Sequence, residues 1–137
     1  MKKVFVDTNV LIDLLADRKP FSKFAIELFG KAERKKVRLY TSSHTFATTH
    51  YLLKKYLNEP ELRDVLYSLL AYVNQVAINA DIIKKALKSK HKDFEDAIQI
   101  IAANTVDQLD YIATRNLKDF KDAGIIVLPP DELVKRI

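Results

Sequence analysis

Short apolar segments alternate along this chain with longer segments of helical periodicity, and no other feature constrains the fold as strongly. The short segments are β-branched or aromatic and are bounded by polar residues, which predicts buried strands. They cover residues 3–6, 38–41, 111–114 and 124–128, with 75–78 as a fifth candidate. The longer segments repeat apolar residues every three or four positions and predict helices over 21–35, 62–73 and 93–106. Strands separated by helices predict an α/β fold with a mostly parallel central sheet of four to five strands, covered by helices on both faces.

The bulk properties fit one folded domain spanning residues 1–137. Hydrophobic residues make up 48% of the sequence, which is enough for a core in a chain of this length. The absence of cysteine excludes disulfides and thiolate metal sites. Asp7, Asn9 and Asp13 interrupt the apolar N-terminal run, and no stretch reaches the roughly 18 apolar residues of a membrane span. We therefore expect a cytoplasmic protein without a membrane partner, whose net charge of +5 weakly favours binding to polyanions.

Several common catalytic motifs are absent. The chain has two glycines, which excludes a glycine-rich phosphate loop or a dinucleotide-binding turn. The histidines, His44, His50 and His91, lack the spacing of a zinc site. Ser42 and Ser43 do not stand in the glycine-flanked elbow of a serine hydrolase. These exclusions direct attention to the carboxylates.

Acidic residues gather where the predicted strands end. Asp7 directly follows the strand 3–6, and Asp119 comes shortly after the strand 111–114. Asp93 and Asp96 lie three positions apart in the first turn of a predicted helix, so both carboxylates share one helix face. In an open parallel sheet, functional residues collect at the carboxyl ends of the strands. We therefore expect these acids to converge.

The acids differ in how well a purely structural role explains them. Asp93 is well placed to cap the helix that follows it, so capping and function are both open for this residue. Asp96 precedes an almost wholly apolar helix and needs a polar partner there. Capping explains Asp7 poorly, because Thr8 or Asn9 would serve as well. Carboxylates that converge in a chain without cysteine favour a hard cation, Mg²⁺ or Mn²⁺, and hydrolysis of a phosphodiester.

Three segments resemble the PIN-domain family. Residues 6–13, VDTNVLID, are similar to the family's opening, an apolar strand followed by DTNVLLD. Residues 93–99, DFEDAIQ, look like the DFEDA segment of one bacterial subgroup, and residues 112–120, IATRNLKDF, resemble the TRNxxDF ending. The three segments occur in the family's order and span nearly the whole chain, which makes the combination specific.

The resemblance implies a three-layer α/β/α sandwich and a metal-dependent endoribonuclease that hydrolyses RNA with Mg²⁺ or Mn²⁺. Many bacterial members are toxins neutralised by a cognate antitoxin, which would be a partner here. Carried over by motif, Asp7 and Asp96 would be the central metal ligands, and Asp93 would be an additional acid. Asn116 and Asp119 would complete the site. Thr8, Asn9 and Thr114 would orient the ligands or water.

One departure from the family pattern keeps other functions open. Thr48 stands where many PIN domains have a glutamate in the pattern SxxTxxE, and Asp93 would have to supply the missing charge. The alternative is a PIN-like module that binds RNA without cutting it, or cuts it weakly. A phosphoacceptor or phosphatase with Asp7 as nucleophile is disfavoured, because Asn9 occupies the position of the second acid that such a phosphatase needs.

Two surface features predict partners. A group of basic residues would either rim the acidic site and hold RNA phosphates or form an ordinary solvated face; it comprises Lys84, Lys85, Lys88, Lys90, Lys92, Arg115 and Lys118. The segment from Tyr51 to Val73 has more apolar and aromatic residues than one helical face can bury. This excess predicts a homodimer, with a helical hairpin packed on its own sheet as the alternative.

Overall fold

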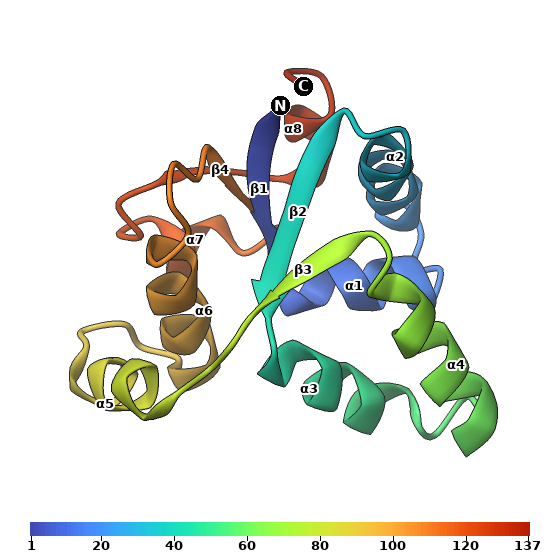
Figure 1. Cartoon of the computed structure of the whole chain (residues 1–137), viewed down its shortest axis with the longest axis horizontal. Helices are drawn as coiled ribbons and strands as arrows, with labels where there is room; N and C mark the ends of the chain where they lie inside the picture. The colour runs from blue at the N-terminus through green and yellow to red at the C-terminus, as the bar shows by residue number, and fades with distance from the viewer.

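A computed structural model describes residues 1–137, and its centre is a parallel sheet of five strands (Figure 1). The strands are β1 (Lys2–Val6), β2 (Val37–Ser42), β3 (Val73–Val76), β4 (Tyr111–Ala113) and β5 (Ile126–Leu128). They lie in the order β3-β2-β1-β4-β5, and every neighbouring pair is parallel. The chain moves outward from β1 to β3 and then returns to the other side of β1, so the topological switch point lies between β1 and β4.

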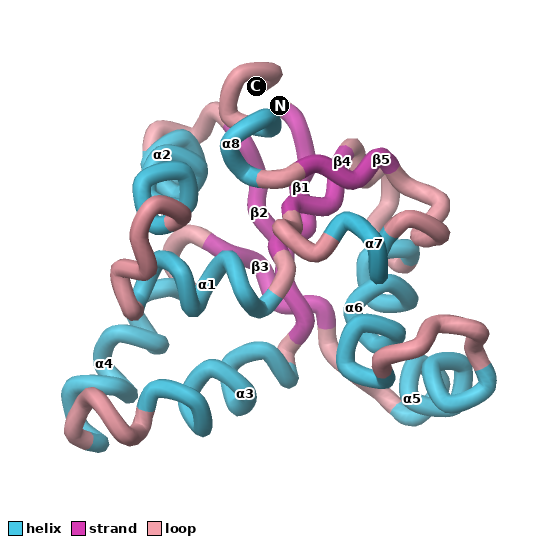
Figure 2. Tube along the Cα trace, turned by 180° about the vertical axis from the view of Figure 1, so that it is seen from behind, coloured by secondary structure: helices cyan, strands magenta, loops and turns pink.

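Helices cover both faces of this sheet, which confirms the predicted three-layer α/β/α fold (Figures 1 and 2). On one face lie α1 (Thr8–Leu15), α2 (Ser22–Glu33), α3 (His44–Leu53), α4 (Glu59–Leu69) and α8 (Pro130–Leu133). On the other lie α5 (Ala80–Lys88), α6 (Phe94–Asn104) and α7 (Leu117–Phe120). None of the helices combines the length and the apolar character needed to cross a membrane.

Alternate residues of the central strand enter separate cores. Val4 and Val6 pack in the larger cluster, which draws on α1, α2 and α4, whereas Phe5 packs against α6 and α7 residues on the opposite face. All three side chains are fully buried. This two-sided burial explains why the strand reads as a continuous apolar run rather than as an alternating one.

Two predicted boundaries are wrong around β3. The helix expected to continue to residue 73 ends at Leu69, and the strand expected over 75–78 begins at Val73. Leu69 and Val73 are both buried in the larger core cluster, so apolar spacing continues across the turn that separates helix from strand. Periodicity alone cannot detect such a change of element.

The last strand is shorter than its apolar run. Strand β5 begins at Ile126 rather than at residue 124. Gly124 has a φ of +79°, a left-handed conformation that glycine adopts readily, so the extended backbone of the strand begins only after it. The strand therefore cannot include the glycine.

Candidate metal centre

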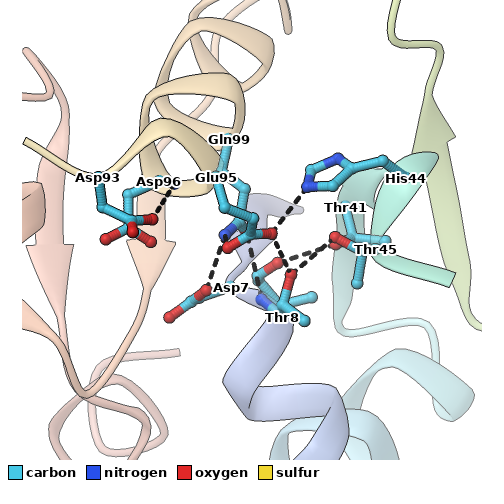
Figure 3. Close-up of polar contacts among 10 residues, drawn as sticks. Asp7, Thr8, Thr41, His44, Thr45, Asp93, Glu95, Asp96 and Gln99 are labelled. Atoms are coloured by element: carbon cyan, nitrogen blue, oxygen red, sulfur yellow. Dashed lines mark hydrogen bonds and ion pairs between the residues drawn. The ribbon is translucent and has the colours of Figure 1, made fainter. Parts of the chain in front are cut away.

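Asp7 stands at the switch point of the sheet. Its backbone is extended, and its N–H donates to the Ala113 carbonyl over 3.0 Å, which continues the pairing of β1 with β4 by one residue. Although Asp7 occupies the N-cap position of α1, its side chain makes no capping hydrogen bond, as the sequence suggested. The carboxylate is fully buried and directed toward α6 (Figure 3).

Neutral donors surround the Asp7 carboxylate. The Thr114 hydroxyl donates to Oδ2 over 2.7 Å, and Gln99 Nε2 donates to Oδ1 over 2.9 Å. No lysine or arginine forms an ion pair with it. Burial raises the pKa of Asp7, the hydrogen bonds from Thr114 and Gln99 oppose that rise, and the Glu95 carboxylate adds to it. The charged form of Asp7 is therefore costly in this setting.

Asp96 approaches Asp7 from the first turn of α6. Burial, followed by repulsion from Asp7 and weaker repulsion from Asp93, Glu95 and Asp119, raises the pKa of Asp96 to about 7. Neighbouring acids therefore add to the effect of burial, and no lysine or arginine pairs with Asp96 to oppose it. A cation bound there would offset the repulsion between the acids and favour the charged form of Asp96 despite its burial.

Asn116 and Thr114 connect the predicted ligands to one another. Asn116 Nδ2 lies 2.8 Å from Asp119 Oδ2 and 3.3 Å from Asp96 Oδ2. The Asn116 backbone N–H donates to the Thr114 hydroxyl over 2.9 Å, and that hydroxyl in turn donates to Asp7. The structure thus brings Asp7, Asp96, Asp119, Asn116 and Thr114 together. Their roles as ligands stay predictions.

Asp93 has a structural role at the same edge. Its Oδ2 accepts the backbone N–H of Asp96 over 2.9 Å and caps α6, so the capping interpretation is confirmed. The side chain is exposed, and its charge is one of the causes of the raised pKa of Asp96. Capping and a contribution to metal binding are compatible, because one carboxylate oxygen remains free of hydrogen bonds.

Glu95 is the site residue that sequence reasoning missed. It accepts hydrogen bonds from Thr8 Oγ1 over 3.0 Å and Gln99 Nε2 over 2.9 Å, and its Oε2 lies 2.7 Å from His44 Nε2 (Figure 3). Oxygen atoms of Asp7, Glu95 and Asp96 all lie within 4.8 Å of one another. Burial alone would raise the pKa of Glu95, but the contacts with His44 and Thr8 lower it overall.

Gln99 was also missed, because it lies in an otherwise apolar helix and carries no charge. It is fully buried, and its amide donates to both Asp7 and Glu95, while its Oε1 accepts the Thr8 backbone N–H over 3.0 Å. The available signal was a single amide within the run AIQIIAA, since a buried amide needs partners. Gln99 therefore positions two of the three clustered carboxylates.

The remaining predicted positions, Thr8, Asn9 and Thr48, differ in how close they come to the carboxylate cluster. The Thr8 and Thr45 hydroxyls lie 2.9 Å apart, which joins α1 to α3 beside Glu95. The Asn9 side chain is exposed and makes no hydrogen bond with the cluster. Thr48 lies three residues after Thr45 on α3, and the third clustered carboxylate comes from Glu95 rather than from position 48 or from Asp93.

The donor set suits a hard divalent cation. Asp7, Glu95 and Asp96 offer only oxygen atoms, sit close together, and have no basic side chain other than His44 in contact. Oxygen-only sets of this kind favour Mg²⁺ or Mn²⁺ over zinc. Without a cation the carboxylates repel one another, and this repulsion adds to burial in raising the pKa of Asp96.

Comparison with known proteins agrees with this geometry. The PIN domain family model matches residues 3–125, and the chain belongs to the PIN domain family. Among curated proteins, Ribonuclease VapC1 of Aquifex aeolicus is 26% identical over 140 residues, covering 98% of this chain and 95% of that protein.

Solved structures show the same fold. A toxin-antitoxin complex from Klebsiella pneumoniae has a chain 30% identical to this one, with a TM-score of 0.66, covering 93% of this chain and 97% of the other. VapC20 of Mycobacterium tuberculosis, described as a Sarcin-Ricin loop cleaving toxin, is 21% identical with a TM-score of 0.71 over 93% of this chain and 99% of that chain. The subgroup suggested by the DFEDA segment is not resolved by these matches.

Proposed function

We propose that this protein is a metal-dependent endoribonuclease and the toxin of a toxin-antitoxin pair. The observation that carries the proposal is the buried cluster of Asp7, Glu95 and Asp96 at the switch point of a PIN fold, with too little positive charge to neutralise it. The names of the similar proteins, a ribonuclease and a toxin that cleaves the sarcin-ricin loop, support the same activity. Because RNA is the proposed substrate, we propose a cytoplasmic location.

The proposed cofactor is Mg²⁺ or Mn²⁺, held by Asp7, Glu95 and Asp96. When bound, such an ion polarises a phosphoryl oxygen and lowers the pKa of water in its coordination shell. Gln99 holds two of the ligands in place through its two amide protons, and Thr114 fixes the other oxygen of Asp7. Ligands held by such outer contacts lose little freedom when the ion binds.

Asp119, Asn116 and Asp93 lie at the more accessible side of the cluster. Asn116 spans Asp96 and Asp119, and Asp93 caps the helix that carries Asp96. In the proposed reaction these groups orient the attacking water and the phosphodiester, in addition to any contact that they make with the ion. Productive orientation of two reactants supplies a large part of the rate enhancement in hydrolysis.

Two protein partners belong to the proposal. The similar chain from Klebsiella pneumoniae comes from a toxin-antitoxin complex, which supports an antitoxin for this chain. Exposed apolar and aromatic side chains on α3, on α4 and in the turn between them support a homodimer: Tyr51, Leu52, Tyr56 and Tyr67 are 58%, 46%, 76% and 78% exposed. A monomer mass by light scattering at tens of micromolar would remove the dimer.

The deciding experiment is an RNA cleavage assay with Mn²⁺ on the wild type and on Asp96→Asn. Asp107→Asn is the matched control, because Asp107 is exposed in the turn before β4, at the opposite edge of the sheet. We expect cleavage by the wild type and the control and none by Asp96→Asn. RNA binding without cleavage by the wild type would instead favour the non-catalytic module, which the substitution at position 48 suggests.

A further inference from the structure

A basic hollow adjoins the proposed metal centre. It is lined by Lys90, His91, Lys92, Lys118, Asp119, Lys121 and Asp122 and has a volume of about 200 Å³. These residues come from the loop between α5 and α6 and from α7 with the turn that follows it, on the same face of the sheet (Figure 2). No apolar side chain contributes to the lining, so the hollow is not built for an apolar ligand.

The basic hollow carries a net positive charge, and its lysines form no ion pairs within the protein. Four lysines face two aspartates there, and none of the four lysines lies within ion-pair distance of any carboxylate. Gathering like charges around one concavity raises the local potential and attracts a polyanion. Lysine ammonium groups suit phosphate oxygens, which accept a point charge from several directions.

Asp119 joins the basic hollow to the metal centre. It lines the hollow, and its Oδ2 accepts a hydrogen bond of 2.8 Å from Asn116 Nδ2, which also contacts Asp96. A ligand that extends from the cluster past Asn116 therefore enters the hollow directly. A phosphodiester chain can reach both places, because it carries a negatively charged phosphate at regular intervals along its length.

We propose that the basic hollow binds a backbone phosphate of the RNA strand next to the phosphodiester that lies at the Asp7, Glu95 and Asp96 cluster. This inference rests on the proposed function, since it names the part of the substrate held outside the metal centre. Binding through phosphate fixes the register of the strand without reading its bases. The hollow therefore contributes affinity and position, and sequence preference must come from other residues.

The test measures binding apart from cleavage. In the Asp96→Asn background, a fluorescently labelled single-stranded RNA is titrated at several KCl concentrations against the variant Lys92→Gln/Lys118→Gln. The matched control is Lys36→Gln/Lys135→Gln, which removes the same charge from exposed positions with no ion pair, at the turn before β2 and after α8. We expect at least a tenfold loss of affinity for the first variant and a salt slope reduced by about 0.7 for each phosphate contact removed.

The outcomes separate this inference from the nuclease proposal. Equal losses of affinity in the two double variants would overturn the basic hollow as a phosphate site, even if the wild type cleaves RNA. A loss of affinity for polyglutamate but not for RNA would overturn it in favour of an acidic peptide. If the wild type fails to cleave RNA but the hollow variant alone loses RNA affinity, the phosphate site is supported and the proposed nuclease activity is rejected.

Discussion

Two aspartates at α1, Asp7 and Asp13, differ completely in their surroundings. Asp7 precedes α1 and Asp13 lies within it, and both side chains are buried, with residue exposures of 0% and 1%. Asp13 accepts two hydrogen bonds from Arg115, of 2.8 and 3.0 Å, and an ion pair of 2.9 Å from Arg18. Asp7 has neutral donors, chiefly Thr114 and Gln99, and other carboxylates around it, and no arginine or lysine pairs with it.

The difference separates a structural carboxylate from one suited to bind a cation. Asp13 is neutralised by two arginines, and Arg115 also stacks on the Phe21 ring, with its guanidinium carbon 3.7 Å from the centroid. This arrangement ties the segment after β4 to the end of α1. Asp7 keeps an uncompensated charge in a buried site, which is stable only with a bound cation or a proton. Burial is therefore common to both acids, and the absence of a positive partner is what distinguishes Asp7 from Asp13.

The largest expected effect concerns catalysis. Asp7→Asn and Asp96→Asn should each lower RNA cleavage by at least about a thousandfold, roughly 4 kcal/mol of transition-state stabilisation, because the ion loses a central ligand. Removing one of several repelling carboxylates should leave the metal-free protein as stable as the wild type or more so. Cleavage assays and thermal melts in chelator measure both quantities. Unfolding of either variant without metal, together with no effect of Mn²⁺ on the wild type, would make that acid a structural group.

Asp13→Asn should show the opposite behaviour. Breaking a buried ion pair from one side leaves Arg115 without its partner and should cost about 3 kcal/mol of unfolding free energy. Urea denaturation measures this loss, and Arg115→Met added to Asp13→Asn should recover part of it. The folded variant should still bind Mn²⁺, since Asp13 does not contact the cluster. Loss of Mn²⁺ binding in folded Asp13→Asn would contradict the separation of roles.

Metal binding itself should stabilise the wild type. Mn²⁺ at a hundredfold excess over its dissociation constant should add about 2.7 kcal/mol to the unfolding free energy by mass action. Asp7→Asn and Asp96→Asn should lose most of this increase, and Glu95→Gln should lose a clear part of it, because Glu95 is a member of the cluster. Thermal melts with and without Mn²⁺ give the values. An undiminished increase in Glu95→Gln would exclude Glu95 as a ligand.

The pH dependence of the metal-free protein should follow from Asp96. Its pKa is raised to about 7 in the folded protein, against about 3.9 in an unfolded chain, so the folded state holds a proton that the unfolded state has lost between these values. Stability should therefore fall as the pH rises from about 4 to about 7 and change little above that. Asp7, whose pKa is also raised, acts in the same direction. Chemical denaturation in chelator across this range should show a flatter profile for Asp96→Asn than for the wild type.

The smallest expected effect is a gain in metal affinity. Thr48→Glu places a carboxylate where many family members have one, and metal affinity should rise modestly if this side chain reaches the cluster. The gain should be larger in the Glu95→Gln background, because one acid then replaces another. Calorimetric titration with Mn²⁺ measures both cases. Loss of metal binding on Thr48→Glu would mean that Glu95 and Asp93 already occupy the available space.

Much of the fold follows from the sequence, because apolar periodicity reports burial directly. The five strands and three of the eight helices, α2, α4 and α6, were predicted with shifts of a few residues, and the boundary errors lie at Val73 and Gly124. At Val73 the apolar spacing passes unbroken from helix to strand, and at Gly124 a left-handed conformation delays the start of the extended backbone. In both places the local conformation depends on a turn rather than on the pattern of burial.

The acids at the carboxyl ends of the strands are also a property of the sequence. Parallel strands end at one edge of the sheet, so Asp7 and the residues after β4 had to meet there once the topology was known. The first turn of α6 carries Asp96 to the same edge and Asp93 caps that helix, as a residue three positions earlier can. These placements depend on chain direction and helical spacing, both of which are local.

Only the tertiary structure decided which carboxylates are paired and which are not. Glu95 enters the site because Thr8 and His44, 87 and 51 residues away, reach it from α1 and α3. Gln99 holds Asp7 across 92 residues, and Arg115 neutralises Asp13 across 102. The physical reason is that the charge state of a buried acid depends on the groups packed around it in three dimensions, and no spacing along a single element encodes contacts between α6, the sheet and α1.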